Sequence, residues 1–249
     1  MEVEQLLNTV MRVGTMLMSS GAEVYRVEDT MNRIAKSFQE VESVQSYVTA
    51  TGIMLSINME GKTRTHIARV RNRNVNVDTI DQINQLSRTC VHQHLSTARI
   101  EEELDRIANQ KRYSFLTTTL FGALGAFGFA IFFKGNWQEM LASFGIGIMI
   151  RCAGWCLTSL KVNDFLNNLV CAMVAAWMSI EIHSFVPEAN INVMVISSIM
   201  LLVPGLAITN AIRDTMSTDY LSGLARGAEA FLCATAIAIG AGVILYIWR

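Results

Sequence analysis

The stretch LLVPGLAITNAIRDTMSTDYLSGLARGAEA, residues 201–230, starts as an apolar run, breaks at Pro204-Gly205 and then sets charges among further apolar residues. Proline removes a backbone donor and clashes with the preceding helical turn, and glycine tolerates unusual dihedral angles. The pair therefore predicts a broken helix. Broken helices in membranes often offer backbone groups to a substrate, whereas the alternative is a simple kink that neighbouring helices satisfy.

Outward from this stretch, the chain divides into a charged half and an apolar half. It has 249 residues and a net charge of -1, but residues 1–112 carry most of the charged side chains. Residues 113–249 form apolar runs that are too continuous for ordinary core helices and predict membrane spans. We expect five spans, at about 113–133, 137–160, 164–186, 190–212 and 221–248.

The first half has the pattern of an α+β domain. Apolar residues at helical spacing predict helices at about 3–17, 24–38, 78–94 and 97–110. Gly21 is a plausible stop for the first helix. The segments SVQSYVTA, GIMLSINM and KTRTHIARV predict strands, and Glu60-Gly61 supplies a hairpin turn between the last two. The expected fold is an α-helical integral membrane protein with five transmembrane helices and an N-terminal cytoplasmic α+β domain, residues 1–112.

Loop charges predict the orientation. One side of the expected spans carries Lys111, Arg112, Lys161 and Arg213, and the other carries Lys134 and Arg249. The positive-inside rule then places the N-terminus in the cytoplasm and the C-terminus outside. The acidic start MEVEQLL also lacks the basic and apolar regions of a secretory signal. We expect a multi-pass protein of the cell (inner) membrane.

Several charged residues lie within or at the ends of the expected spans. Arg151 interrupts the second span, where arginine is costly unless it faces protein or water, or snorkels to the headgroups. Arg226 and Glu229 lie three residues apart on one helix face, so they form a local ion pair or leave the arginine to an anionic carboxylate. Glu181 and His183 end the third span, as a proton relay or as a solvated outer end.

Other features point away from enzyme chemistry. The sequence contains no phosphate loop, nucleophile elbow or zinc motif, and we expect no cofactor, metal or nucleic acid. Four cysteines lie in apolar runs and are expected to be small buried hydrophobes: Cys152, Cys156, Cys171 and Cys233. A basic strand and loop is expected to be solvated or to face the inner leaflet, with capture of an acidic solute as the alternative; it comprises Arg64, His66, Arg69, Arg71 and Arg73.

Four blocks of the sequence resemble the threonine/serine exporter family. They are SSGAEVYRVEDTMNRIA (19–35), VTATGIMLSI (48–57), TRTHIARV (63–70) and VPGLAITNAIRDTMSTDYLSGLARGAEA (203–230). The resemblance runs over nearly the whole chain and respects block order. The motif positions that it carries over are Arg26, Glu28, Pro204, Gly205, Asn210, Asp214, Gly223, Arg226 and Glu229. It implies a cytoplasmic domain followed by a membrane exporter region.

Longer members of the family have about twice the expected spans, so this chain resembles the larger subunit of a two-component branch that exports succinate with a smaller membrane partner. The resemblance implies a secondary active exporter of a succinate-like dicarboxylate or of threonine and serine, with homo-oligomers as the competing assembly. Expected substrate contacts are Arg151, Pro204, Gly205, Thr209, Asn210 and Arg226, and expected coupling residues are Asp214, Glu229 and Glu181. The rivals are a membrane-anchored enzyme using Arg26, Glu28 and His66, and a regulatory or assembly subunit.

Overall fold

The computed structural model describes residues 3–70, 74–110 and 113–248. Arg71, Arg73, Lys111, Arg112 and Arg249, which entered the charge arguments above, lie outside these ranges. The chain forms two compact units, one of residues 1–111 with 209–227 and one of residues 112–208 with 228–249. The first unit thus contains a late segment, 209–227, that a single boundary at residue 112 does not anticipate.

The first unit is built on a three-stranded antiparallel sheet in the order β1 (Val41–Thr49), β2 (Gly52–Met59) and β3 (Lys62–Arg69). These strands confirm the predicted ones. Glu60 and Gly61 have φ angles of 52° and 68°, so the predicted hairpin turn is confirmed as well. Alternate residues of β2 are buried beneath the sheet, because strand side chains point to opposite faces in turn.

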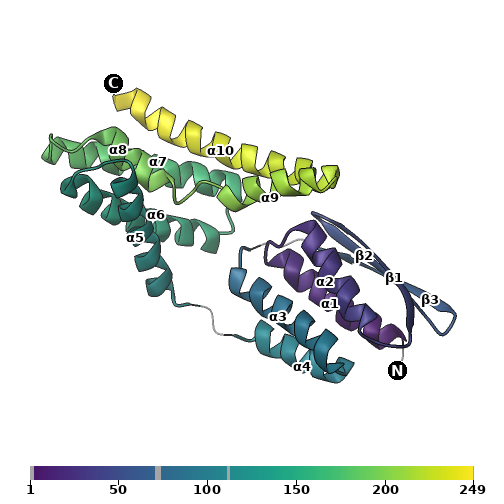
Figure 1. The fold of residues 1–249 in the computed structure, drawn as a ribbon. Coiled ribbons are helices and arrows are strands. Elements are labelled where there is room, and N and C mark those ends of the chain that lie inside the picture. Colours follow the sequence, from purple (N-terminus) through teal and green to yellow (C-terminus); the bar gives the residue numbers. More distant parts are fainter. Residues whose placement is uncertain (1–2, 71–73, 111–112, 249) are drawn as a thin grey trace. The chain divides into compact units, whose positions relative to one another are not determined.

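Helices cover one face of this sheet (Figure 1). α1 (Val3–Ser19) and α2 (Val24–Lys36) pack directly on it, and α3 (Val77–Gln93) and α4 (Thr97–Ala108) pack on α1 and α2. One apolar core joins all four helices and the sheet, with Leu6, Leu17, Met31, Ile53, Leu55, Ile83 and Leu104 among its fully buried members. The helical spacing of apolar residues therefore predicted the buried faces of these four helices.

The late segment of the first unit is a helical hairpin. It consists of Thr209–Met216 from α9 (Gly205–Met216) and Tyr220–Gly227 from α10 (Tyr220–Trp248). We call residues 209–227 the α9–α10 hairpin. Its two helices touch at Gly223, where a Cβ atom would lie only 3.0 Å from the carbonyl oxygen of Ala211. The absence of a side chain at this position allows the close crossing.

The second unit contains α5 (Phe115–Phe132), α6 (Trp137–Ser159), α7 (Asp164–Phe185), α8 (Ile191–Ile199) and the rest of α10. Among the described residues, α5, α6, α7 and α10 are long and apolar enough to cross a membrane. They coincide with four of the expected spans. The expected span at 190–212 is instead two helices, α8 and α9, separated by Met200–Pro204. The break predicted from Pro204-Gly205 is confirmed.

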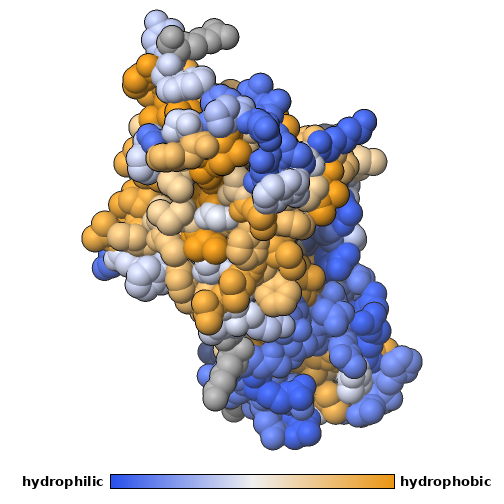
Figure 2. Space-filling model, turned by 90° about the vertical axis from the view of Figure 1, so that its left-hand side faces the viewer, coloured by the Kyte–Doolittle hydropathy of each residue, from blue (hydrophilic) through white to orange (hydrophobic). Residues whose placement is uncertain are grey.

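The second unit has the apolar surface and the close helix packing that are typical of membrane-spanning helices. Much of the face drawn in Figure 2 is hydrophobic, and Phe121 and Phe132 are among the exposed aromatic residues. Close packing uses glycine: a Cβ on Gly147 would lie 3.0 Å from the Cα of Ala123. The prediction that cysteines in apolar runs are buried holds for Cys171, holds in part for the half-buried Cys233, and is wrong for Cys152 and Cys156, which are exposed on α6.

Candidate functional site

Three side chains of the α9–α10 hairpin hold the loop between α1 and α2, which we call the α1–α2 loop (residues 20–23). The Nδ2 atom of Asn210 donates to the carbonyl oxygen of Gly21 at 3.0 Å. The Nη2 atom of Arg226 donates to the carbonyl oxygen of Ala22 at 2.7 Å. The backbone N–H of Val24 donates to Oδ1 of Asp214 at 3.2 Å. Residues far apart in the sequence thus meet within one unit.

The local sequence explains why this loop needs outside partners. Gly21 adopts a φ of +85°, which glycine accepts without strain, and the chain turns there after α1. Glu23 occupies the N-cap position of α2 but makes no side-chain cap hydrogen bond. Asp214 supplies the missing acceptor from another helix. A carboxylate at a helix N-terminus also interacts favourably with the helix dipole.

Asp214 and Arg226 form a buried ion pair inside this cluster. Nε of Arg226 lies 3.1 Å from Oδ2 of Asp214, and both residues are almost fully buried. Burial raises the pKa of Asp214 above its ordinary value, while Arg226 and the Val24 N–H partly oppose that rise. Removing charges from water is costly, so each partner depends on the other in the folded state. The pair ties α9 to α10 as well as to the loop.

Arg26 and Glu28, the motif residues of α2, have different partners. Glu23 forms ion pairs with Arg213 and, at 2.9 Å, with Nε of Arg26. Oε1 of Glu28 accepts a hydrogen bond from the N–H of Val48 at 2.8 Å, and burial raises the pKa of Glu28.

His66, the third residue named for an enzyme site, lies on β3. Its Nδ1 atom is 3.0 Å from Oδ1 of Asn8. The structure therefore gives Arg26, Glu28 and His66 separate contacts with the α1–α2 loop, β1 and α1. Sequence reasoning missed Ser222, whose Oγ accepts a hydrogen bond from the N–H of Ala50 at 3.2 Å, and no local signal pointed to it.

The expected substrate contacts are divided between the two units. Thr209, Asn210 and Arg226 belong to the first unit, and Arg151, Pro204 and Gly205 belong to the second. Arg151 is exposed on α6, and its Cγ and Cδ atoms pass 3.4 Å from the position that a Cβ on Gly122 of α5 would occupy. Its apolar stem thus crosses α5 where there is no side chain.

Two residues that follow the break are exposed. Gly205 is exposed at the start of α9, and Thr209 is exposed one turn later. Residues four apart lie on the same face of a helix, so both belong to one side of α9. Glu181 of α7 and Glu229 of α10, the other proposed coupling residues, are exposed as well.

Glu139 is a buried carboxylate that sequence reasoning missed. Its Oε2 atom accepts from the N–H of Asn136, and its Oε1 atom accepts from the N–H of Asn190, both at 2.8 Å. It thereby joins the loop before α6 to the loop before α8. The available signal was the spacing Asn136-x-x-Glu139, because such a capping box closes a helix N-terminus.

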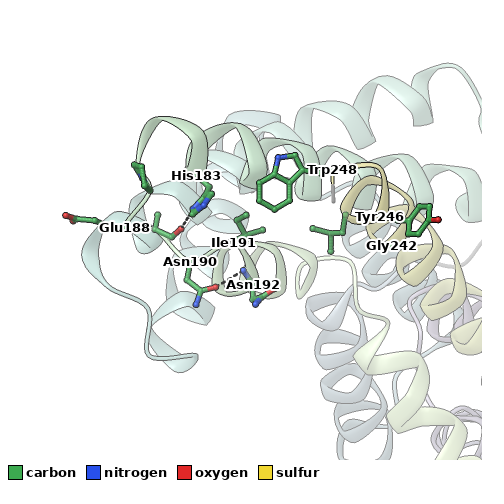
Figure 3. A pocket seen from close by; sticks show the side chains of 11 residues that line it. His183, Glu188, Asn190, Ile191, Asn192, Gly242, Tyr246 and Trp248 are labelled. Atoms are coloured by element: carbon green, nitrogen blue, oxygen red, sulfur yellow. Dashed lines mark hydrogen bonds between the residues drawn. The ribbon is translucent and has the colours of Figure 1, made fainter.

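A hollow of about 680 Å³ lies beside the second of these loops (Figure 3). His183, Glu188, Asn190 and Asn192 give it polar groups, and Trp248 closes it from the end of α10. Nδ1 of His183 is 2.8 Å from the carbonyl oxygen of Ala189, and its ring meets that of Trp248 edge to face. These contacts fix the imidazole at the end of α7.

A family model and several known proteins match this chain. The model of a family described as "Putative threonine/serine exporter" matches residues 8–248. The "Probable succinate transporter subunit YjjP" of Escherichia coli (strain K12) is 24% identical over 94% of this chain and 91% of its own length. The protein of the same name from Klebsiella aerogenes is 24% identical over 93% and 90%. The "Probable threonine/serine exporter" of Mycobacterium tuberculosis is 20% identical over 96% of this chain and 46% of its own length. No solved structure matches the chain.

Proposed function

Because the chain belongs to the threonine/serine exporter family, we propose that it is one subunit of a secondary active exporter for a small carboxylate-bearing metabolite. The three relatives described above are named as probable transporter subunits for succinate or as a probable exporter of threonine and serine. All of these solutes present a carboxylate. The broken helix at Pro204-Gly205, in a chain with four helices of membrane-spanning length, is the observation that carries the proposal.

We propose five membrane crossings, and the order of the elements supports this number. α5, α6 and α7 cross three times, and the α9–α10 hairpin belongs to the same unit as residues 1–111. The chain must therefore return between residues 186 and 208. α8 has 9 residues and is too short to cross a hydrocarbon core of about 30 Å alone. Together with the break and the first turn of α9 it makes a discontinuous fourth crossing, and α10 is the fifth.

Under this proposal the first unit lies in the cytoplasm. With five crossings, the order of the elements would put Lys161 and Arg213 on the same side of the membrane as residues 1–111 and Lys134 on the opposite side. Cytoplasmic loops carry the excess of positive charge in inner-membrane proteins. The excess is small, which makes the orientation the first point to test by labelling.

The substrate carboxylate meets the break and Arg151. α9 starts at the break, and the N-terminus of a helix is the positive end of its dipole, which suits an anion. Thr209 adds a hydroxyl on the same exposed face as Gly205. Arg151 supplies a guanidinium that binds carboxylates with two parallel hydrogen bonds. An intramembrane arginine that faces a passage rather than lipid avoids most of its insertion cost.

Asn210 and Arg226 act as positioning residues under this assignment. Both are buried and engaged with the α1–α2 loop, so direct contact with substrate would break the hydrogen bonds to Gly21 and Ala22. Asp214 is the leading coupling residue, because protonation would cancel the charge that faces Arg226 and remove an acceptor from Val24. Glu229 and Glu181 are the further candidates.

A second membrane subunit completes the exporter. The Escherichia coli relative is named as a subunit and has nearly the length of this chain. The Mycobacterium tuberculosis exporter has about twice the length that this chain matches. Five crossings are few for enclosing a passage, and Arg151 must be shielded from lipid.

Export from whole cells tests the proposal. Cells that hold this chain and its candidate partner are loaded with labelled succinate, threonine or serine, and outflow is measured at equal membrane abundance. We expect outflow of at least one solute, its loss in Arg151→Ala, and its retention in Lys134→Ala, which removes an exposed cation of a loop. Equal outflow with and without the chain for all three solutes contradicts the proposal.

A further inference from the structure

The α9–α10 hairpin has its polar and apolar faces reversed relative to a soluble protein. Asn210, Asp214, Ser222 and Arg226 are buried against the rest of the first unit. The large apolar side chains point outward, with exposed fractions of 58% for Ile212, 80% for Met216, 64% for Tyr220, 70% for Leu221 and 74% for Leu224. We call these five residues the outer face of the hairpin.

Such a surface needs an apolar covering. Scattered exposed hydrophobic residues are ordinary, but a contiguous apolar patch marks a contact with protein or membrane. Here the five residues lie on two helices that touch at Gly223, so they belong to one compact element, with Arg213, Thr215, Ser217 and Thr218 exposed between them. The buried polar side chains of the hairpin, Asn210 and Arg226 among them, form hydrogen bonds with the α1–α2 loop.

The length of α10 identifies the covering as lipid. α10 has 29 residues, about 43 Å at 1.5 Å per residue, which exceeds a hydrocarbon core of about 30 Å. Its portion in the second unit, 228–248, measures about 31 Å and matches that core. The first turns, Tyr220–Gly227, then extend into the headgroup layer, which brings the membrane to about 40–45 Å in total.

The chemistry of the outer face fits that layer. Tyrosine is enriched at membrane interfaces, where its ring is apolar and its hydroxyl is wet. Tyr220 belongs to the outer face, and Tyr25 of α2 borders it across a groove of about 580 Å³ that Ile212 and Met216 also line. Arg213 lines the same groove and carries the positive charge that suits lipid phosphates.

We propose that the outer face of the α9–α10 hairpin is an interfacial anchor that lies in the headgroup layer of the bilayer and attaches the first unit to the lipid surface. The buried face of the same hairpin forms hydrogen bonds with the α1–α2 loop, so one element would connect the lipid surface to the rest of the first unit. This inference rests on α10 crossing the bilayer and is independent of which solute is exported.

Spin labels on the full chain, with its partner subunit, test the anchor. The five native cysteines are replaced, and single cysteines are introduced as Met216→Cys and Leu224→Cys in vesicles of phosphatidylethanolamine and phosphatidylglycerol. Gln45→Cys, exposed on β1, is the water reference, and Leu141→Cys, exposed on α6, is the bilayer reference. Ile212→Cys and Tyr220→Cys provide a second pair if either first variant fails to fold. A spin label that is accessible to oxygen lies in lipid, and one that is accessible to a polar nickel chelate lies in water.

We expect labels at 216 and 224 to favour oxygen over the chelate, at a depth between the two references. Labels as open to the chelate as the one at residue 45 would show a water-exposed face and overturn the proposal. Labels closed to both reagents would show a protein covering, such as the partner subunit or a second copy, and would overturn it equally. Transport plays no part in the readout, so failure here leaves the exporter assignment untouched.

Discussion

The carboxylate of Asp214 accepts a hydrogen bond from the backbone N–H of Val24, at 3.2 Å, and so caps α2 from a helix that begins near the other end of the chain. The same carboxylate lies against Arg226, which in turn donates to the carbonyl oxygen of Ala22. One buried ion pair therefore connects the α1–α2 loop with both helices of the α9–α10 hairpin. If Asp214 or Arg226 moves during transport, the hydrogen bonds to Val24 and Ala22 must change with it.

Asp214→Ala should destabilise the protein strongly. It leaves the buried guanidinium of Arg226 without its carboxylate and the Val24 N–H without its acceptor. Loss of one partner of a buried pair costs about 3–5 kcal/mol, whereas replacing both costs less. The measurement is denaturant unfolding of the purified protein in micelles for Asp214→Ala, Arg226→Met and the double variant. Asp81→Ala, on an exposed site of α3, is the control, and an Asp214→Ala midpoint equal to that of the control contradicts the prediction.

The stability contributed by Asp214 should depend on pH. Burial raises its pKa in the folded state above the ordinary value of 3.8. A carboxyl with a raised folded-state pKa contributes fully below its unfolded pKa and loses that contribution as the pH rises through the folded pKa. Asp214→Asn cannot titrate. The unfolding free energy of the wild type minus that of Asp214→Asn should therefore increase as the pH falls from neutral toward 3.8, and a difference that shrinks on acidification has the wrong sign.

Local patterns explain why much of the fold could be predicted. The strand-like segments SVQSYVTA, GIMLSINM and KTRTHIARV predicted all three strands, and the pair Glu60-Gly61 predicted the turn between the last two, because both signals are carried by neighbouring residues. Apolar length placed α5, α6, α7 and α10 to within two residues of their expected ends. The Pro204-Gly205 break was predicted, but the short length of α8 was not, since continuous hydropathy hid the gap at Met200–Pro204.

The site could be predicted only as a set of residue types. Asn210, Asp214 and Arg226 stood out as polar residues in apolar sequence, yet their partners are backbone groups of Gly21, Ala22 and Val24, about 190–200 residues earlier. No periodicity in a single sequence relates positions so far apart. The three-residue spacing of Arg226 and Glu229 instead suggested an ion pair within one helix. The structure shows an ion pair between Arg226 and Asp214, which lies on another helix.

Cysteine labelling should show that the loop before α6 lies outside the cell and the loop before α7 inside. Asn136 and Asn163 are matched positions, because each is an exposed N-cap residue whose side chain accepts a helix N–H. Neither substitution by cysteine changes the loop charge, and each forfeits one cap worth about 1 kcal/mol. On intact cells an impermeant thiol reagent should modify residue 136 and leave residue 163 unmodified until the cells are opened. The reverse pattern overturns the orientation.

Substitution of the two arginines should separate binding from positioning. Lysine keeps the charge but cannot reproduce the two parallel hydrogen bonds of a guanidinium. Arg151→Lys is expected to raise the KM for the exported carboxylate on the order of tenfold, since a charged hydrogen bond contributes about 1.5–3 kcal/mol. Arg226→Lys should lower the maximal rate and the thermal stability with little change in KM. Concentration series of flux in vesicles give both constants, and an equal rise in KM for the two variants would place Arg226 in contact with substrate.

Flux through purified protein tests the central claim most directly. Vesicles are prepared with this chain alone, with its candidate partner alone and with both, and the movement of labelled succinate, threonine and serine is followed under an imposed proton gradient. The account predicts carboxylate flux with both chains, abolished by dissipating the gradient, and little flux with either alone. Full flux from this chain by itself would contradict the two-subunit assembly, and no flux of any of the three solutes with both chains present would contradict the exporter itself.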